Sequence, residues 1–428
     1  MAKLFKWIAI VAAGGVLLSI GGAIALQSWL RTDDFRARVE REATAALGVP
    51  LQLGRLSVDL WPLPAVAADQ VRLATQPPLT IDRVEARPLW ASLLAGRLDI
   101  ATLVVRQAVL PQAGIAALGA TLQKKDKAAP RKSPAPAATA APGSQPIGLP
   151  RNIVLDAITW VDEKGQRLTT DAKGDLGADG LLDQASFKIT HGRFAGVKGE
   201  IQREGEQFPL RIDIGGGRIA GKLRMQPGKA AGVQVLSGIL TTENVEVAAL
   251  TAPSKPLTGK LQAQTTLRAE YRELGQLADV LQTQTRFTVR DAVVQGIDLA
   301  KAVETIGMNR GGITRLDTLA GQVATSGKAV HVTNLVASSG ALAATGNVSI
   351  APNKALSGRV NVDLATAKGA LGVPLSVGGT VDAPSVTLTR GALAGAAIGT
   401  LLAPGVGTAA GASAGDKLGD KLKGLFGR

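Results

Sequence analysis

Between Gly259 and Pro384 the sequence alternates apolar and polar residues over several long segments. In one segment the apolar or small positions are Leu261, Ala263, Thr265, Leu267, Ala269 and Tyr271, and the polar ones are Gln262, Gln264, Thr266, Arg268 and Glu270. Val360, Val362 and Leu364 alternate with polar neighbours in the same way. A period of two residues is typical of β-strands with one dry and one wet face. Because the region predicts little helix, nothing obvious covers the dry face.

The composition fits a mainly β fold. The chain has 428 residues, enough for two or three domains, and 46% of them are hydrophobic although only 3% are aromatic. Val, Leu, Ile and Ala therefore supply the apolar surface, which suits a smooth sheet face. We predict an N-terminal transmembrane helix followed by an antiparallel β-sheet with few short helices.

The N-terminal segment predicts a membrane anchor. Residues 7–30 contain no charged side chain, and about 20 apolar residues are enough to cross a bilayer as a helix. Lys3 and Lys6 precede the segment, which places the N-terminus in the cytoplasm and the rest outside. The proposed anchor residues are Trp7, Leu17, Leu18, Ile20, Leu26 and Trp29. The alternative is a cleaved signal peptide ending near Ala25, which would export the chain equally.

The sequence divides into six segments by composition. These are the anchor (1–30), an N-terminal helix and β region (31–122), a linker rich in Pro, Ala and Lys (123–150), a middle β region (151–257), a C-terminal β region (258–390) and a Gly-rich tail (391–428). A helix is expected from residue 33 to about 47, with Gly48 and Pro50 ending it. Short helices are expected near 90–94, 274–281 and 298–306. The strands are expected at 51–60, 66–74, 80–87, 98–106, 108–110, 184–190, 199–203, 210–214 and 222–225.

The linker and the tail differ in composition from the β regions. The linker has six prolines and five basic residues against Asp126 alone, so it predicts a disordered insertion; a contact with anionic lipid or peptidoglycan is the alternative. In the tail, Gly391, Gly395 and Gly399 have the spacing of close helix packing. Leu418, Leu422, Leu425 and Phe426 give its end an amphipathic helix that would contact a membrane or the protein's own sheet.

The lack of characteristic motifs argues against nucleic-acid binding and catalysis. The net charge is +14, but no recognition helix, aromatic stacking motif or zinc spacing accompanies it. The chain has no cysteine and two histidines, His191 and His331, neither with a second ligand at metal spacing. His331 lies between two valines of a predicted strand and should point to the wet face. We therefore expect no enzyme activity, no cofactor and no metal site.

Two regions of the sequence resemble the AsmA family. In the first half these are the capped helix, LGVPLQLGRLSVDLWPLPAVAADQVRLA (47–74) and IDRVEARPLWASLLAGRLDIATLVVRQAVLP (81–111). In the second they are FTVRDAVVQGIDLAKAV (287–303), LAGQVATSGKAVHVTNLVASSGALAATGNVSI (319–350) and VPLSVGGTVDAPSVTL (373–388). The similarity covers about half the chain, and the proline-rich insertion departs from the family's larger members.

The resemblance implies a protein of the bacterial inner membrane whose bulk faces the periplasm. Its strands would curl into a gutter-like groove with an apolar floor, which holds or conducts phospholipid towards the outer membrane. The floor candidates are Leu261, Ala263, Leu267, Ala269, Phe287, Val289, Val348, Ile350, Val360, Val362 and Leu364. The alternatives are a scaffold for outer-membrane protein assembly factors that binds no lipid and an enzyme of envelope metabolism, for which no residue can be nominated.

Overall fold

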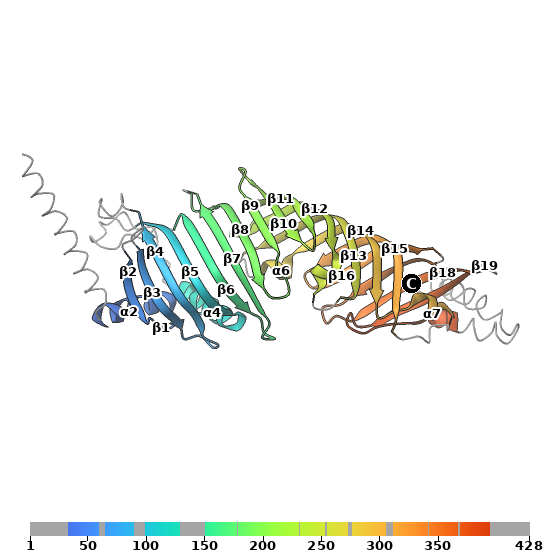
Figure 1. The fold of residues 1–428 in the computed structure, drawn as a ribbon, viewed down its shortest axis with the longest axis horizontal. Coiled ribbons are helices and arrows are strands. Elements are labelled where there is room, and N and C mark those ends of the chain that lie inside the picture. Colours follow the sequence, from blue (N-terminus) through green and yellow to red (C-terminus); the bar gives the residue numbers. More distant parts are fainter. Residues whose placement is uncertain are drawn as a thin grey trace, which may run out of the picture. The chain divides into compact units, whose positions relative to one another are not determined.

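The computed structural model divides the chain into two compact units, unit 1 (Met1–Gly196) and unit 2 (Val197–Arg428). It describes residues 33–59, 65–89, 99–128, 150–177, 179–230, 232–252, 255–272, 276–304, 311–340, 342–366 and 369–393. The division at Gly196 lies inside the predicted middle β region. The described residues are mainly strand, as the alternation predicted, and the helices among them are few (Figure 1).

Unit 1 contains eight described strands. They are β1 (Leu51–Gln52), β2 (Arg55–Asp59), β3 (Ala65–Leu73), β4 (Leu79–Pro88), β5 (Ile100–Pro111), β6 (Asn152–Val161), β7 (Arg167–Leu176) and β8 (Leu182–His191). Both β1 and β2 pair with β3, and the remaining strands pair in chain order. All these pairs are antiparallel except β5–β6, which is parallel. The expectation of an antiparallel sheet is wrong at this pair: β6 begins beside the start of β5, with Asn152 opposite Thr102, and runs in the same direction.

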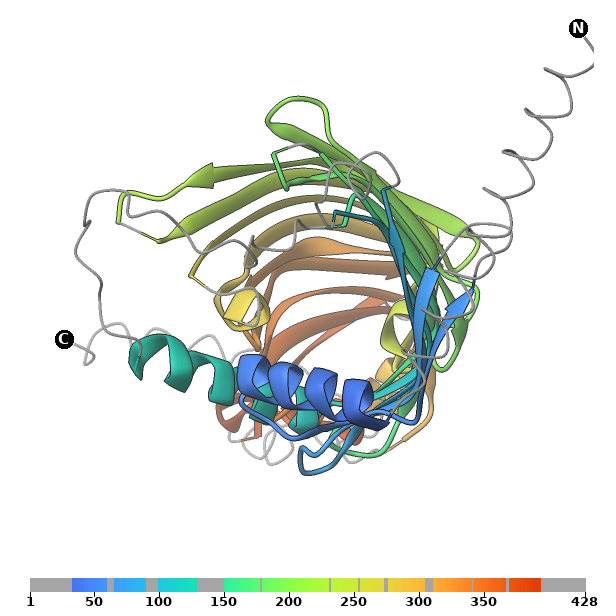
Figure 2. The same cartoon turned by 90° about the vertical axis from the view of Figure 1, so that its left-hand side faces the viewer.

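Two helices cover one face of unit 1. α2 (Asp33–Leu47) spans the helix predicted at 33–47 and begins with two acidic residues. α4 (Gln112–Ala128) follows β5. Leu47 of α2 and Leu118 of α4 pack against a cluster of Val71, Leu73 and Leu79. The two helices lie side by side (Figure 2). The sequence did not predict α4, which continues past residue 123 into the predicted linker.

Unit 2 contains twelve described strands, each pairing antiparallel with the next. They are β9 (Lys198–Gln202), β10 (Gln207–Ile214), β11 (Gly217–Pro227), β12 (Gln234–Glu246), β13 (Leu257–Tyr271), β14 (Gln282–Gln295), β15 (Ile313–Ser326), β16 (Ala329–Ser339), β17 (Leu342–Ile350), β18 (Leu356–Thr366), β19 (Gly369–Gly379) and β20 (Pro384–Leu388). The described helices are α5 (Val247–Thr251), α6 (Leu277–Val280) and α7 (Leu299–Glu304). The last two fall where short helices were expected.

Bulges bend several of these strands. Asn244, Asp291 and Asn334 have positive φ within β12, β14 and β16, and the strand register shifts beside each of them. The extra residue leaves a backbone N–H without its ladder partner, and the N–H of Asn334 donates instead to Asn347 Oδ1 at 3.0 Å. A bulge increases local bending and twist, and the strands of unit 2, yellow to orange in Figure 2, run as arcs.

Several expectations lie outside the described residues. They include every anchor residue from Trp7 to Trp29, the helix near 90–94 and the tail contacts Leu418, Leu422, Leu425 and Phe426. Within the part of the chain that the structure describes, no helix is both long and apolar enough to cross a membrane. Several strand boundaries differ from prediction: the strand expected at 51–60 splits at Leu53-Gly54, and β5 runs unbroken through Gln107. The strands β6, β7 and β12 were not among the expected ones.

A buried carboxylate joins three arginines on the face of unit 1 opposite the helices. Glu85 neighbours Val84, which packs against the helix-covered cluster, so the two side chains point to opposite faces. The Glu85 side chain is 8% exposed and lies 2.8 Å from Arg83, 3.1 Å from Arg87 and 3.6 Å from Arg106. Burial alone would raise its pKa, but the hydrogen bonds from Arg83 and Arg87 and the charge of Arg106 outweigh it and lower the pKa below 4.5.

We predict that acid weakens unit 1 through Glu85. Because its folded-state pKa is depressed, the stabilisation is present above the unfolded value near 4.5 and is lost as pH falls through the folded-state pKa. Glu85→Gln should remove this pH dependence and, at pH 7, cost about 2 kcal/mol of unfolding free energy. Hydrogen exchange of β3–β5 in the full chain, corrected for the intrinsic rate, measures both effects.

Glu270→Gln is the matched control, because the Glu270–Arg268 pair has side chains 57% and 61% exposed. It should leave exchange in its own strand unchanged within about 0.5 kcal/mol. Equal acid sensitivity of β3–β5 in Glu85→Gln and in the unaltered chain would contradict the assignment to Glu85.

Candidate functional site: the inner face of unit 2

The strand register of unit 2 brings the apolar positions onto one continuous face. Leu261 is opposite Val289 and Ala263 is opposite Phe287 across β13 and β14. On the other side of β13, Thr265 is opposite Leu240 of β12. The same face continues through β11 and β10, where the aligned positions are Gly238, Leu223 and Phe208, and Leu240, Gly221 and Leu210. We call this surface the inner face, because it carries the core of the unit.

Charge divides cleanly between the two faces. From β10 to β14 the register places no charged side chain of the described residues on the inner face. The opposite face carries Arg211, Asp213, Arg218, Lys222, Arg224, Glu243, Lys260, Arg268, Glu270, Arg286 and Arg290. The inner face is therefore a neutral surface that offers no ion pair to whatever lies on it.

The polar groups of the inner face satisfy one another. Thr265 and Thr285 are opposite each other, with their hydroxyl oxygens 2.9 Å apart. Thr283 and Thr325 form a second such pair at 2.7 Å. Among the described residues no buried side-chain nitrogen or oxygen lacks a hydrogen-bond partner. Hydrocarbon laid on these four threonines would therefore leave their hydroxyls paired.

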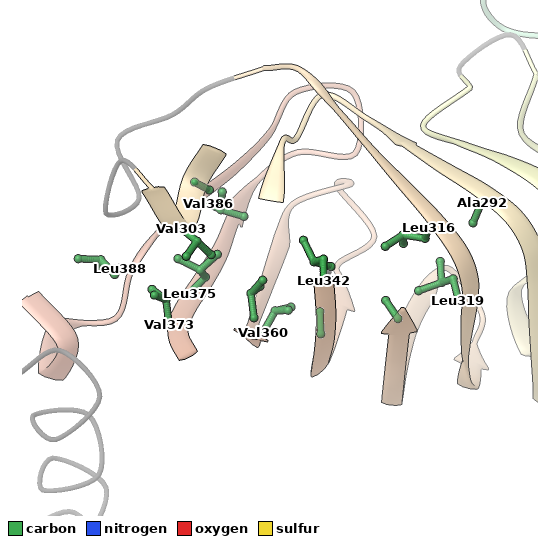
Figure 3. Packing of buried hydrophobic residues seen from close by; sticks show 14 of the residues in the cluster. Ala292, Val303, Leu316, Leu319, Leu342, Val360, Val373, Leu375, Val386 and Leu388 are labelled. Carbon is green, nitrogen blue, oxygen red and sulfur yellow. The ribbon is translucent and has the colours of Figure 1, made fainter. Parts of the chain in front are cut away.

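The inner face changes from uncovered to filled along unit 2. Phe208, Leu210, Leu223, Leu236 and Leu240 on β10–β12 are only half-buried. On β14–β20 the inner side chains at one end of the strands form a packed cluster (Figure 3), which is the largest core among the described residues. Val332, Ile350 and Leu356, at the other strand ends, are half-buried outside it. The cluster includes Val289, Leu316, Leu342, Val360, Val362, Leu375 and Val386, together with Ala302 and Val303 of α7.

All eleven predicted floor residues lie on the inner face, but in different surroundings. Val289, Val360 and Val362 belong to the packed cluster, and Leu261, Phe287, Val348 and Leu364 pack against it. Leu267 and Ile350 are half-buried outside the cluster, and Ala263 and Ala269 are buried outside it. The protein's own side chains therefore occupy much of the surface that the sequence nominated.

Five further half-buried apolar positions of the inner face were missed. Phe208, Leu210, Leu223, Leu236 and Leu240 fall in the predicted middle region, from which no site residue was nominated. The signal was present as alternation at Phe208, Leu210 and Ile212. The predicted strands there were too short to make it conspicuous, since 210–214 and 222–225 correspond to β10 at 207–214 and β11 at 217–227.

The helix-covered face of unit 1 has a similar uncovered part. Val105 of β5 lies beside Leu155 of β6, which is opposite Ala172 of β7, itself opposite Phe187 of β8. All four are half-buried. Trp160 of β6 is 38% exposed. An apolar sheet face without a complete cover thus occurs in each unit separately.

The other candidate groups are dispersed. His331 is exposed, as predicted, with Nδ1 3.0 Å from Ser349 Oγ, and His191 is exposed at the end of β8. No three metal-ligating side chains gather within the described residues. A shallow hollow of about 510 Å³ lies at the bulge of β12, beside Glu243, Gln262 and Arg286. None of these groups forms an arrangement that we can assign to a reaction.

Comparisons of the chain with protein-family models, curated proteins and solved structures found no match. The inner face is therefore the feature from which we infer a function.

We predict that the packed part of the inner face stabilises unit 2. Leu375 is fully buried, so Leu375→Ala should cost about 2–5 kcal/mol through lost burial and a cavity. Val336→Ala, at a side chain that is 52% exposed, should change the unfolding free energy by less than about 0.5 kcal/mol. Hydrogen exchange of β17–β19 in the full chain compares the two, and equal effects would contradict the core assignment.

Proposed function

We propose that this chain holds or conducts phospholipid in the apolar β-groove formed by the uncovered inner face. The observation that carries the proposal is a long sheet face with aliphatic side chains, no charge from β10 to β14 and threonine hydroxyls paired with each other. Lipid transport or holding needs no catalytic residues, so on this proposal the protein is not an enzyme.

Hydrocarbon fits this surface better than a protein segment does. An extended polypeptide laid on the inner face would bring N–H and C=O groups that need partners, and each unpaired buried group costs free energy. The threonine hydroxyls are already engaged, at 2.9 and 2.7 Å. An acyl chain makes no such demand, and each methylene removed from water contributes about 0.8 kcal/mol.

The contact would also allow movement. Hydrophobic attraction has no preferred direction, so a chain lying on small and aliphatic side chains can slide with little change in energy. The AsmA-like segments and the charge-free residues 7–30 support an inner-membrane anchor with the bulk in the periplasm. In that setting the cargo is phospholipid passing between the inner and outer membranes, in support of outer-membrane biogenesis.

Polar blocks on the uncovered part of the face test the proposal. Leu240 and Leu267 are half-buried, lie on the inner face and do not belong to the packed cluster. Leu240→Asp and Leu267→Asp should therefore leave the protein folded but lower co-purified phospholipid at least tenfold, as measured by mass spectrometry of lipid extracts. Val362→Asp is unsuitable because Val362 is fully buried in the cluster and a charge there should unfold the unit.

Thr266→Asp is the matched control, since Thr266 is exposed on the opposite face beside Leu267. It introduces the same charge in the same strand and should leave the lipid content unchanged. Undiminished loading in both inner-face variants would reject the groove, and equal loss in Thr266→Asp would show an effect on folding.

The second candidate is a scaffold for the assembly of outer-membrane proteins. It is favoured by β20, which has five residues and pairs only with the Leu375–Gly379 half of β19 among the described residues. An edge strand carries unpaired backbone N–H and C=O groups that another chain can pair with. Crosslinks from β20 to assembly factors, in a preparation that carries no phospholipid, would favour this function over the first.

A further inference from the structure

One helix, α7, covers part of the inner face of unit 2. Leu299–Glu304 lies over the inner face, in contact with β15 and β18. Ala302 and Val303 of this helix are 0% and 2% exposed. Figure 3 shows Val303 close to Leu375, with Val386 of β20 beyond them. The helix thus completes the packed cluster at one end of the inner face.

One end of α7 is held by hydrogen bonds and the rest by apolar contacts. Thr314 of β15, which is 5% exposed, accepts from the backbone N–H of Leu299 at 3.0 Å and donates to the carbonyl of Ile297 at 2.8 Å. Asp298 accepts from the N–H of Lys301 at 3.0 Å. The buried contacts of Ala302 and Val303 are with aliphatic side chains of the cluster.

We infer that α7 is a stopper that keeps acyl chains out of the packed cluster on β14–β20 and so confines them to the half-buried part of the inner face. The inference rests on the proposed function and adds where the cargo ends. A close-packed core has no room for a chain, so lipid can enter the cluster only when α7 moves away. Its displacement exchanges one set of aliphatic contacts for another, because hydrocarbon can cover Val362 and Leu375 as Val303 does.

A photoreactive leucine placed throughout the full chain reads out cargo position. Photo-leucine is close to leucine in size, and ultraviolet light links it to whatever touches it. With phospholipid loaded, adducts should form on the uncovered leucines: Leu210, Leu223, Leu236, Leu240 and Leu267. The covered leucines should carry at least tenfold less adduct: Leu316, Leu342, Leu375 and Leu388. Peptide mass spectrometry gives both sets from one sample.

Two variants test whether α7 causes the boundary. Val303→Asp places a charge in the packed contact and should drive the helix out, and Thr314→Val removes the hydrogen bonds at its held end without adding charge. In either variant adducts should spread to Leu342 and Leu375. Lys301→Gln, at an exposed position of the same helix, should keep the original boundary. Hydrogen exchange of β18–β19 identifies any variant that has unfolded instead.

The outcomes separate this inference from the proposed function. Adducts on Leu375 in the unaltered chain would overturn the stopper while supporting the lipid groove. An unchanged boundary in both folded variants would also overturn it. No lipid adduct on any inner-face leucine would reject the groove and, with it, the cargo that the stopper confines.

Discussion

The apolar face of a long sheet has to be covered by something, and this requirement governs the structure. Strands with aliphatic side chains on one side are unstable in water unless that side is removed from solvent. In this chain the cover is partial. In unit 1, α2 and α4 pack over Leu73 and Leu79. In unit 2, α7 and the curved strands β14–β20 enclose a common core.

Two features keep the remaining apolar surface ordered. Bulges at Asn244, Asp291 and Asn334 bend the strands, and they let inner positions stay inner where the register shifts: Thr242 and Val245 both lie opposite inner-face residues of β13. The opposite face carries the charged side chains from β10 to β14, which keep that face in contact with water. A surface that is curved and neutral and whose threonine hydroxyls are paired favours hydrocarbon over a polar ligand, which is why lipid is the cargo we propose.

The strands and their faces could be predicted from the sequence because alternation reports local geometry. All eleven nominated floor residues lie on one face, and the short helices near 277–280 and 299–304 fall where expected. What alternation could not distinguish was a side chain packed by the protein from one left uncovered. Val362 and Leu267 have the same pattern of neighbours, yet Val362 is fully buried in the core and Leu267 is half-buried outside it.

By itself the sequence determined the fold class, the dry face and the absence of recognisable catalytic motifs, because these follow from residue type and spacing. Only the tertiary structure decided that β5 and β6 run parallel, that α4 covers unit 1 and that α7 fills one part of the inner face. Each of these depends on residues distant in sequence. Leu118 packs against the cluster that contains Val71, and Val303 packs beside Leu375, only once the sheet in each unit has folded.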